Sequence, residues 1–150
     1  MVNRVVIDLV PEIYQAAVRL QQALEAAGLH QHYAELIKIR ASQINGCAYC
    51  INMHARAARK LGISEWKIYL LSAWRESTVF DEKERAVLAW TEALTRVSER
   101  GAPHELYAEL ARHFSDREIV AINTAVAMIN YWNRTTIGFG TVHPTEKGLE

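Results

Sequence analysis

Two cysteines and one histidine are the residues of this sequence best suited to carry chemistry. Cys47 and Cys50 are the only cysteines among the 150 residues, and His54 follows four positions after the second. In a helix with about 3.6 residues per turn, these three side chains share one face with Ala58 and Leu61. The spacing therefore predicts a dithiol and a histidine that point inward, toward a core or a subunit contact, beside a cleft for a substrate.

Two physical effects favour the thiolate, the form of cysteine that reacts. The first turn of a helix directs unpaired amide hydrogens and the positive end of the helix dipole toward Cys47 and Cys50. The imidazole of His54 can accept the thiol proton of Cys50 or stabilise the thiolate as a cation. Burial on an apolar face opposes ionisation, but we expect the dipole and the histidine to outweigh it.

A thiolate in this setting can reduce a peroxide. It attacks a peroxide oxygen, becomes a sulfenic acid and is resolved by the second thiol as a disulfide. The three-residue spacing of Cys47 and Cys50 puts both sulfur atoms on adjacent turns, close enough for this disulfide to form. A partner dithiol would then reduce it by thiol–disulfide exchange. We therefore expect a small-molecule hydroperoxide as substrate and a dithiol protein as reductant, with no bound cofactor and no metal.

The rest of the chain predicts helices that would hold this group in place. Apolar residues recur at spacings of three and four, and prolines occur only at positions 11, 103 and 144. The expected helices cover approximately 11–28, 31–44, 47–61, a segment from 64, 81–100 and 115–136, followed by an irregular tail from 138 to 150. Asn45 is the expected cap of the third helix, and Asp81–Glu84 and Ser115–Glu118 have capping-box spacing. We predict an all-α fold of six or seven helices, in a single domain over residues 1–150.

Charge and hydropathy exclude several classes of function. Seventeen basic residues balance seventeen acidic ones, without the one-sign blocks typical of nucleic-acid binding. The first ten residues hold too short an apolar run, interrupted by Asp8, for a secretory signal. The stretch from Ile119 to Ile129 is too short to span a bilayer. We therefore expect a cytoplasmic protein with neither nucleic acid nor membrane as a partner. In such a compartment a lone cysteine pair more often reacts or binds metal than staples a fold.

The segment from Glu35 to His54 resembles the core motif of the alkyl hydroperoxidase D-like proteins of the carboxymuconolactone decarboxylase superfamily. The shared pattern is a glutamate, eleven intervening residues, Cys-x-x-Cys, three residues and a histidine, and this sequence satisfies every position. The resemblance implies an all-helical fold and peroxidase activity. It also implies that Cys50 is the peroxidatic thiol, Cys47 the resolving thiol and His54 the base, with Glu35 in a proton relay.

The resemblance further implies a homo-oligomer, because trimers and hexamers occur in this family with the motif helix near subunit contacts. In the best-studied peroxidase branch a lipoyl protein is the reductant, and a histidine precedes the second cysteine. Tyr49 holds that position here, so one member of that branch's relay is missing. The decarboxylases of the superfamily do not depend on a Cys-x-x-Cys pair, and its presence therefore favours the redox branch.

Other interpretations of the same residues stay open. The cysteines could be small core residues, and Glu35 could simply pair with Lys38. Cys47, Cys50 and His54 could bind zinc with Glu35 as the fourth ligand, although no other histidines form a second ligand pair. The dithiol could also switch subunit contacts in a redox-sensing or assembly protein without turnover. A thioredoxin-like fold is excluded because its Cys-x-x-Cys follows a strand.

Aromatic residues are mostly expected in the core. Trp66, Trp74 and Trp90 lie in helical patterns without nearby polar residues. The segment Tyr131–Arg134 predicts core or subunit packing, with Trp132 and Arg134 as alternative residues of a cleft. Tyr49, on the face opposite the cysteines, is expected to pack against a neighbouring helix.

Overall fold

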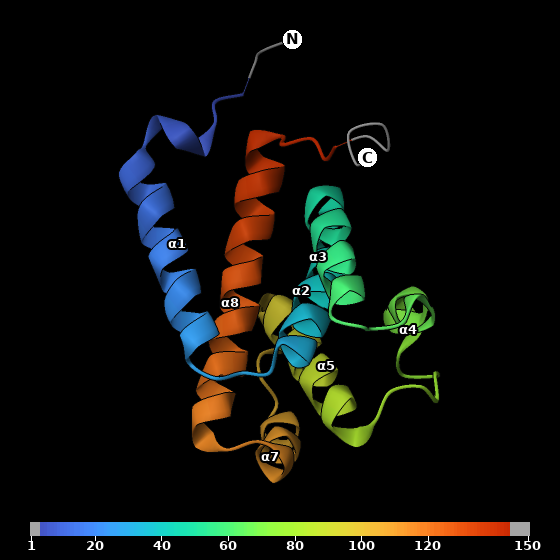
Figure 1. Ribbon diagram of the computed structural model, residues 1–150. Coiled ribbons are helices and arrows are strands. Elements are labelled where there is room, and N and C mark those ends of the chain that lie inside the picture. Colours follow the sequence, from blue (N-terminus) through green and yellow to red (C-terminus); the bar gives the residue numbers. More distant parts are fainter. Residues whose placement is uncertain (1–3, 145–150) are drawn as a thin grey trace.

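The computed structural model describes residues 4–144, and within that range the protein is helical and contains no strand (Figure 1). The described residues form eight α-helices, namely α1 (Pro11–Ala26), α2 (Gln31–Asn45), α3 (Ala48–Lys60), α4 (Glu65–Leu70), α5 (Glu82–Thr95), α6 (Val97–Arg100), α7 (His104–His113) and α8 (Asp116–Phe139). Two short 3-10 turns, Ile7–Leu9 and Leu71–Ala73, precede α1 and follow α4. The predicted all-α class is confirmed, and the helix count exceeds the expected six or seven. The single-domain boundary stays a prediction.

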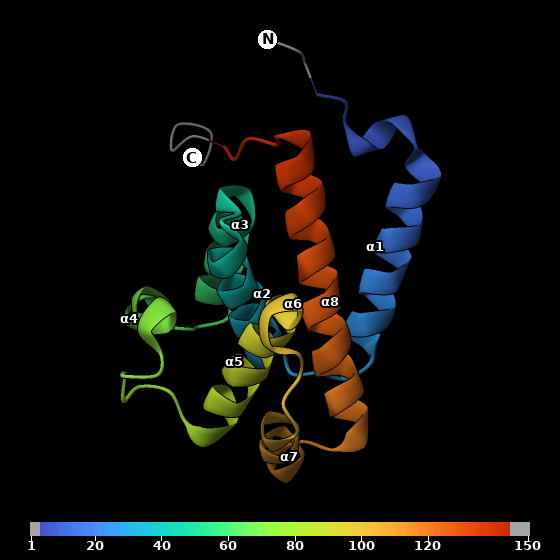
Figure 2. The same cartoon turned by 180° about the vertical axis from the view of Figure 1, so that it is seen from behind.

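Helix α2 is the centre of the fold. It contacts α3, α5 and α8, and Figures 1 and 2 show it enclosed by these helices from both sides. Apolar residues from two of its faces enter two hydrophobic clusters, with Ile37 in the one shared with α5 and α8, and Leu36 in the one shared with α3 and Leu71. Both side chains are fully buried. Packing on two sides therefore fixes the orientation of the neighbouring residues of α2.

The two capping boxes predicted from the sequence are confirmed. Asp81 and Ser115 each form the predicted capping box, with Glu84 and Glu118 respectively, at the first turns of α5 and α8. The expected helix over 81–100 divides in two, because Arg96 leaves the helical region with φ −109° and ψ 36°. Helix α8 ends three residues later than predicted, at a left-handed Gly140, so the irregular tail begins there. Residues 145–150 of that tail lie outside the described residues.

The prediction for the tryptophans holds for two of three. Trp74 and Trp90 are buried, whereas Trp66 is 64 % exposed on the short helix α4, so its placement in the core was wrong. The expectation that they lack polar neighbours was wrong for Trp74, whose indole donates a 2.8 Å hydrogen bond to Glu92. Of this six-residue helix, Ile68 and Leu70 pack against the core, whereas Trp66 lies on the exposed side.

Helix α1 stands at the edge of the bundle and is the least embedded long helix. It contacts α8, and Leu24 is its only buried residue (Figures 1 and 2). Several large apolar side chains on α1 or just before it are exposed, including Val10, Ile13 and Leu20. Among the described residues, no helix has both the length and the apolar character needed to cross a membrane.

Candidate active site

The candidate site begins at the tight junction between α2 and α3. Gly46 adopts the left-handed conformation, with φ 70°, and allows the chain to reverse after Asn45. The amide of Cys47 then donates to the carbonyl of Ser42 at 2.9 Å, which fixes the turn. Cys47, and not Asn45 as predicted, caps α3, because its Sγ accepts a hydrogen bond from the amide of Cys50 at 3.3 Å.

Asn45 instead joins a polar network that attaches the junction to α8. Its side-chain amide donates to Asn130 at 3.0 Å and to Asn133 at 2.9 Å. Asn133 in turn donates to the hydroxyl of Ser42 at 2.9 Å, and both residues are fully buried. Each group in this buried network has a partner, so breaking any link would leave an unsatisfied polar atom. Residues of both α2 and α8 thus fix the start of α3.

The two cysteines form a disulfide across this first turn, with their Cα atoms 5.3 Å apart. Cys47 is 1 % exposed and Cys50 2 % exposed, so the predicted inward orientation is confirmed for both. His54 follows one turn later, and its side chain is also largely buried, at 12 % exposed. Leu61, expected on the same face, is 46 % exposed because the helix ends there and the chain turns away at Gly62.

Glu35 and His54 meet across the α2–α3 interface, nineteen positions apart in the sequence. Oε2 of Glu35 lies 2.9 Å from Nδ1 of His54, and Oε1 accepts a hydrogen bond from Nζ of Lys38 at 2.8 Å. The carboxylate therefore has both partners that the sequence offered as alternatives, one on each oxygen. Burial raises the pKa of Glu35, but the hydrogen bond and positive charge of His54, together with Lys38, outweigh it and hold this pKa below its ordinary value.

This pairing fixes which ring nitrogen of His54 can take part in proton transfer. An ionised Glu35 is only an acceptor, so Nδ1 must carry the hydrogen that it donates to the carboxylate. The neutral imidazole then has its lone pair on Nε2. Nε2 is then the ring nitrogen with a lone pair for proton exchange, and the ring itself borders a cavity.

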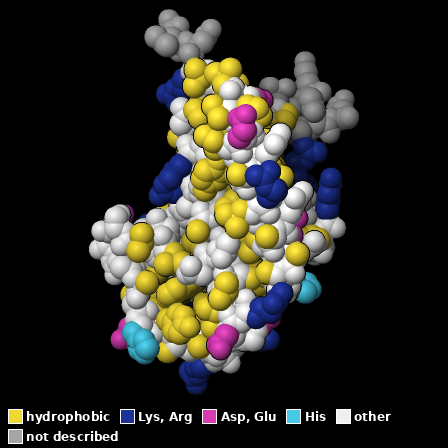
Figure 3. Space-filling view, turned by 90° about the vertical axis from the view of Figure 1, so that its left-hand side faces the viewer, with side chains coloured by type: hydrophobic (Ala, Val, Ile, Leu, Met, Phe, Trp, Pro, Cys, Tyr) yellow, Lys and Arg dark blue, Asp and Glu magenta, His cyan; other side chains and the backbone are white. Residues whose placement is uncertain are grey.

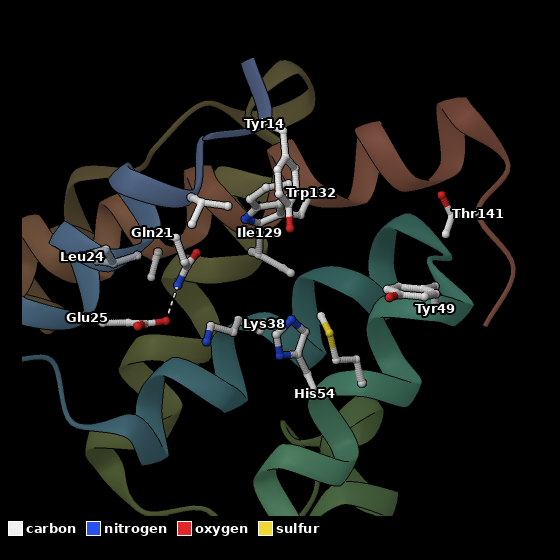
Figure 4. A pocket seen from close by; sticks show the side chains of 13 residues that line it. Tyr14, Gln21, Leu24, Glu25, Lys38, Tyr49, His54, Ile129, Trp132 and Thr141 are labelled. Carbon is white, nitrogen blue, oxygen red and sulfur yellow. Dashed lines mark hydrogen bonds between the residues drawn. The ribbon is translucent and has the colours of Figure 1, made fainter. Parts of the chain in front are cut away.

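A cavity of about 360 Å³ adjoins the histidine, between α1, α3 and α8 (Figure 4). Apolar side chains form much of its wall, namely Val18, Leu24, Met53, Ala125 and Ile129. Three aromatic residues also line it, namely Tyr14, Tyr49 and Trp132. The wall includes His54 and Lys38 but neither cysteine.

The sequence predicts only part of this wall. Trp132 was an alternative cleft residue and does line the cavity, whereas Arg134 lies outside the wall and donates to Asn130. Tyr49 is half-buried and lines the cavity, and its expected packing against a neighbouring helix stays a prediction. Tyr14 was missed because a single tyrosine on an amphipathic helix gives no signal that distinguishes a cavity wall from a packed surface.

The arrangement of the two cysteines, His54 and Glu35 bears on the alternative of a zinc site. Within residues 4–144, no three His, Cys, Asp or Glu side chains are grouped so that they could hold a metal ion. The two cysteines bond to each other, and Glu35 is already engaged by His54 and Lys38. The donor set proposed for zinc is therefore arranged here as a disulfide beside an ion pair.

A helical bundle with a buried Cys-x-x-Cys pair and a glutamate–histidine pair beside it defines the class of protein. Residues 11–93 match the model of the carboxymuconolactone decarboxylase family, and the chain belongs to that family. Within it, the chain is alkyl hydroperoxidase D-like, in agreement with the resemblance seen in the motif.

Relatives extend this likeness over nearly the whole chain. A solved protein of unknown function from Agrobacterium tumefaciens, to which a role in antioxidant defence as AhpD has been ascribed, is 46 % identical and superposes with a TM-score of 0.90 over 93 % of this chain and 95 % of its own. The uncharacterised protein YdfG of Bacillus subtilis is 35 % identical over 133 residues, which are 89 % of this chain and 90 % of that protein. The debrominase Bmp8 shares the fold, with a TM-score of 0.80 at 23 % identity over 90 % of this chain and 73 % of its own. These findings, with the disulfide-forming pair, fit a redox role.

Proposed function

We propose that this protein is a dithiol peroxidase that reduces hydroperoxides through Cys50 and Cys47. The observation that carries the proposal is the 2.9 Å contact between Glu35 and His54, on the helix face that follows the buried cysteine pair. A structural disulfide alone has no need of a buried histidine oriented by a carboxylate. A redox-active pair does, because its thiol must lose a proton before it can attack.

The first half of the cycle would use Cys50 as the attacking thiol. Nε2 of His54, one turn away, accepts the thiol proton, and Glu35 stabilises the resulting imidazolium through Nδ1. The thiolate attacks one peroxide oxygen, so that a sulfur–oxygen bond forms and the oxygen–oxygen bond breaks. The departing alkoxide takes the proton from His54 and leaves as an alcohol, and Cys50 is left as a sulfenic acid.

The second half would regenerate the disulfide seen in the structure. The thiol of Cys47 attacks the sulfenic sulfur of Cys50, a disulfide forms, and water leaves with the thiol proton. A lipoyl- or thioredoxin-like dithiol protein would then return the pair to two thiols while becoming a disulfide itself. Cys47 suits the resolving role because its sulfur lies at the cap of α3, against the amide of Cys50.

We also propose that the protein works as a homo-oligomer, a trimer or a hexamer. Figure 3 views the molecule from the side of α1 and shows hydrophobic side chains gathered on that face. Val5, Val6, Leu9, Val10 and Ile13 belong to this apolar end, and each is at least 46 % exposed. A second copy would remove this surface from water.

Intact-mass analysis after one equivalent of peroxide tests the proposed cycle. The reduced wild type is expected to lose two hydrogens as the disulfide forms, and Cys47→Ser is expected to stop with one added oxygen on Cys50. Cys50→Ser is expected to consume no peroxide. Sustained peroxide consumption by both single variants would contradict the proposal, and a wild type that oxidises once without turnover in the presence of excess dithiol would indicate a redox switch instead.

A further inference from the structure

The cavity beside His54 has features that identify the kind of molecule it would take. Its volume of about 360 Å³ lies within the range of pockets that hold small organic ligands. Hydrogen peroxide fills only a small part of such a space. A wall with this much apolar and aromatic surface binds a hydrocarbon body better than it binds a small polar oxidant.

Two polar side chains of the wall form hydrogen bonds with neighbouring carboxylates. Lys38 donates to Glu35 at 2.8 Å, and Gln21 donates to Glu25 at 3.1 Å. The ion pair with Glu35 offsets the charge of Lys38, and Glu25 itself repels anions. The charges around the cavity therefore favour a neutral ligand over a fatty-acid-like one.

Tyr14 and Trp132 stand on the side of the cavity away from the dithiol helix. Their rings meet edge to face with centroids 6.1 Å apart, and Figure 4 shows them facing His54 across the space. Tyr14 comes from α1 and Trp132 from α8, so the two rings close the cavity from different helices. A molecule held against them would direct its other end toward Nε2 of His54.

We propose that this cavity binds neutral, apolar organic molecules of about the size of one substituted ring, and that Tyr14 and Trp132 select neutral organic hydroperoxides over hydrogen peroxide. The first part is a binding property. The second rests on the proposed peroxidase function. The hydrocarbon body contacts the two aromatic side chains, and the peroxide group lies toward His54 and, beyond it, the thiol of Cys50.

Binding is tested without turnover in the variant with Cys47→Ser and Cys50→Ser together. Calorimetric titration with 2-phenyl-2-propanol, the alcohol product of cumene hydroperoxide, is expected to show one saturable site. Adding Trp132→Ala or Tyr14→Ala is expected to weaken binding about tenfold, as the loss of apolar pocket contacts does in other sites. Trp66→Ala is the matched control, because Trp66 is 64 % exposed and lies outside the cavity wall.

Selectivity is tested with the cysteines intact. The ratio of kcat/KM for cumene hydroperoxide to that for hydrogen peroxide is expected to fall about tenfold in Trp132→Ala, and to stay at the wild-type value in Trp66→Ala. A hydroperoxide that carries a carboxylate is expected to be a poorer substrate than cumene hydroperoxide. Tyr14→Ala gives a second test if Trp132→Ala fails to fold, because the Tyr14 side chain is 42 % exposed.

The outcomes separate the inference from the proposed function. Saturable binding of the alcohol that depends on Trp132, with no turnover of any peroxide, would uphold the cavity as a binding site and contradict the peroxidase function together with the selectivity. Peroxide turnover with no detectable binding of the alcohol, or with an unchanged selectivity ratio in both aromatic variants, would overturn the inference alone.

Discussion

Helices α2 and α1 have similar lengths and opposite relations to the rest of the molecule. Six of the fifteen residues of α2 are buried, including Glu35, whereas only Leu24 among the sixteen of α1 is buried. Helix α2 positions the proposed acid–base pair and is packed on two sides. Helix α1 supplies one wall of the cavity, including Tyr14, and leaves much of its apolar surface exposed. The chemistry thus lies on the rigid part of the fold, and the contacts that would choose a ligand lie partly on the loosely attached part.

The largest expected effect concerns the acid–base pair at the rigid interface. His54→Gln is expected to lower kcat/KM for hydroperoxide about 10²- to 10⁴-fold, because the thiol of Cys50 loses the base that takes its proton. Steady-state peroxide consumption with excess dithiol measures it. A loss of less than about threefold would show that the histidine takes no part in proton transfer.

The next largest effect is expected on the free energy of unfolding, to which α2 should contribute more than α1. Leu36→Ala in α2 removes a fully buried side chain and is expected to lower the free energy of unfolding by about 2–5 kcal/mol. Urea denaturation followed by circular dichroism measures the change. An effect below about 1 kcal/mol would mean that α2 is not the rigid centre described above.

The charge on Glu35 predicts a pH dependence of stability. Its pKa lies below the ordinary value of 4.5, so its interactions with His54 and Lys38 stabilise the fold above that value, and this contribution is lost as pH falls through the lowered pKa. Denaturation of wild type and Glu35→Gln from pH 7 to 3 is expected to show wild type losing stability more steeply below pH 4.5. Parallel curves for the two proteins would contradict the ion pair.

The smallest effect is expected in α1. Leu20→Ala changes a side chain that is 49 % exposed, and in dilute protein it is expected to alter stability by less than about 0.5 kcal/mol. Leu36→Ala measured under the same conditions is the comparison. A loss as large as that of Leu36→Ala would show that α1 is as firmly packed as α2, which would remove the contrast between the two regions.

The sequence predicted most of the fold because its signals are local. The capping boxes at Asp81 and Ser115 and the glycine after Asn45 each depend on residues within one or two turns, and all three mark real boundaries. The break at Arg96 and the exposure of Trp66 depend on how distant elements pack. Helical periodicity carries no information of that kind.

The same difference between local signals and long-range packing applies to the candidate site. Helical spacing correctly placed Cys47, Cys50 and His54 on one inward face, because all three belong to one segment. The contact between Glu35 and His54 joins two helices, and only the family resemblance indicated it. Tyr14 and Trp132 are 118 positions apart in the sequence, and their meeting depends on how α1 lies against α8.

The cap of α3 makes the backbone amide of Cys50 a reporter of the state of its neighbour. That amide donates to the sulfur of Cys47 at 3.3 Å, so any event that alters the charge or bonding of this sulfur changes the electronic surroundings of one identifiable nitrogen. In a ¹⁵N-labelled sample, the amide resonance of Cys50 is expected to shift between the oxidised and reduced proteins. This resonance would report the redox state of the cysteine pair without a dye, a partner protein or a mutation.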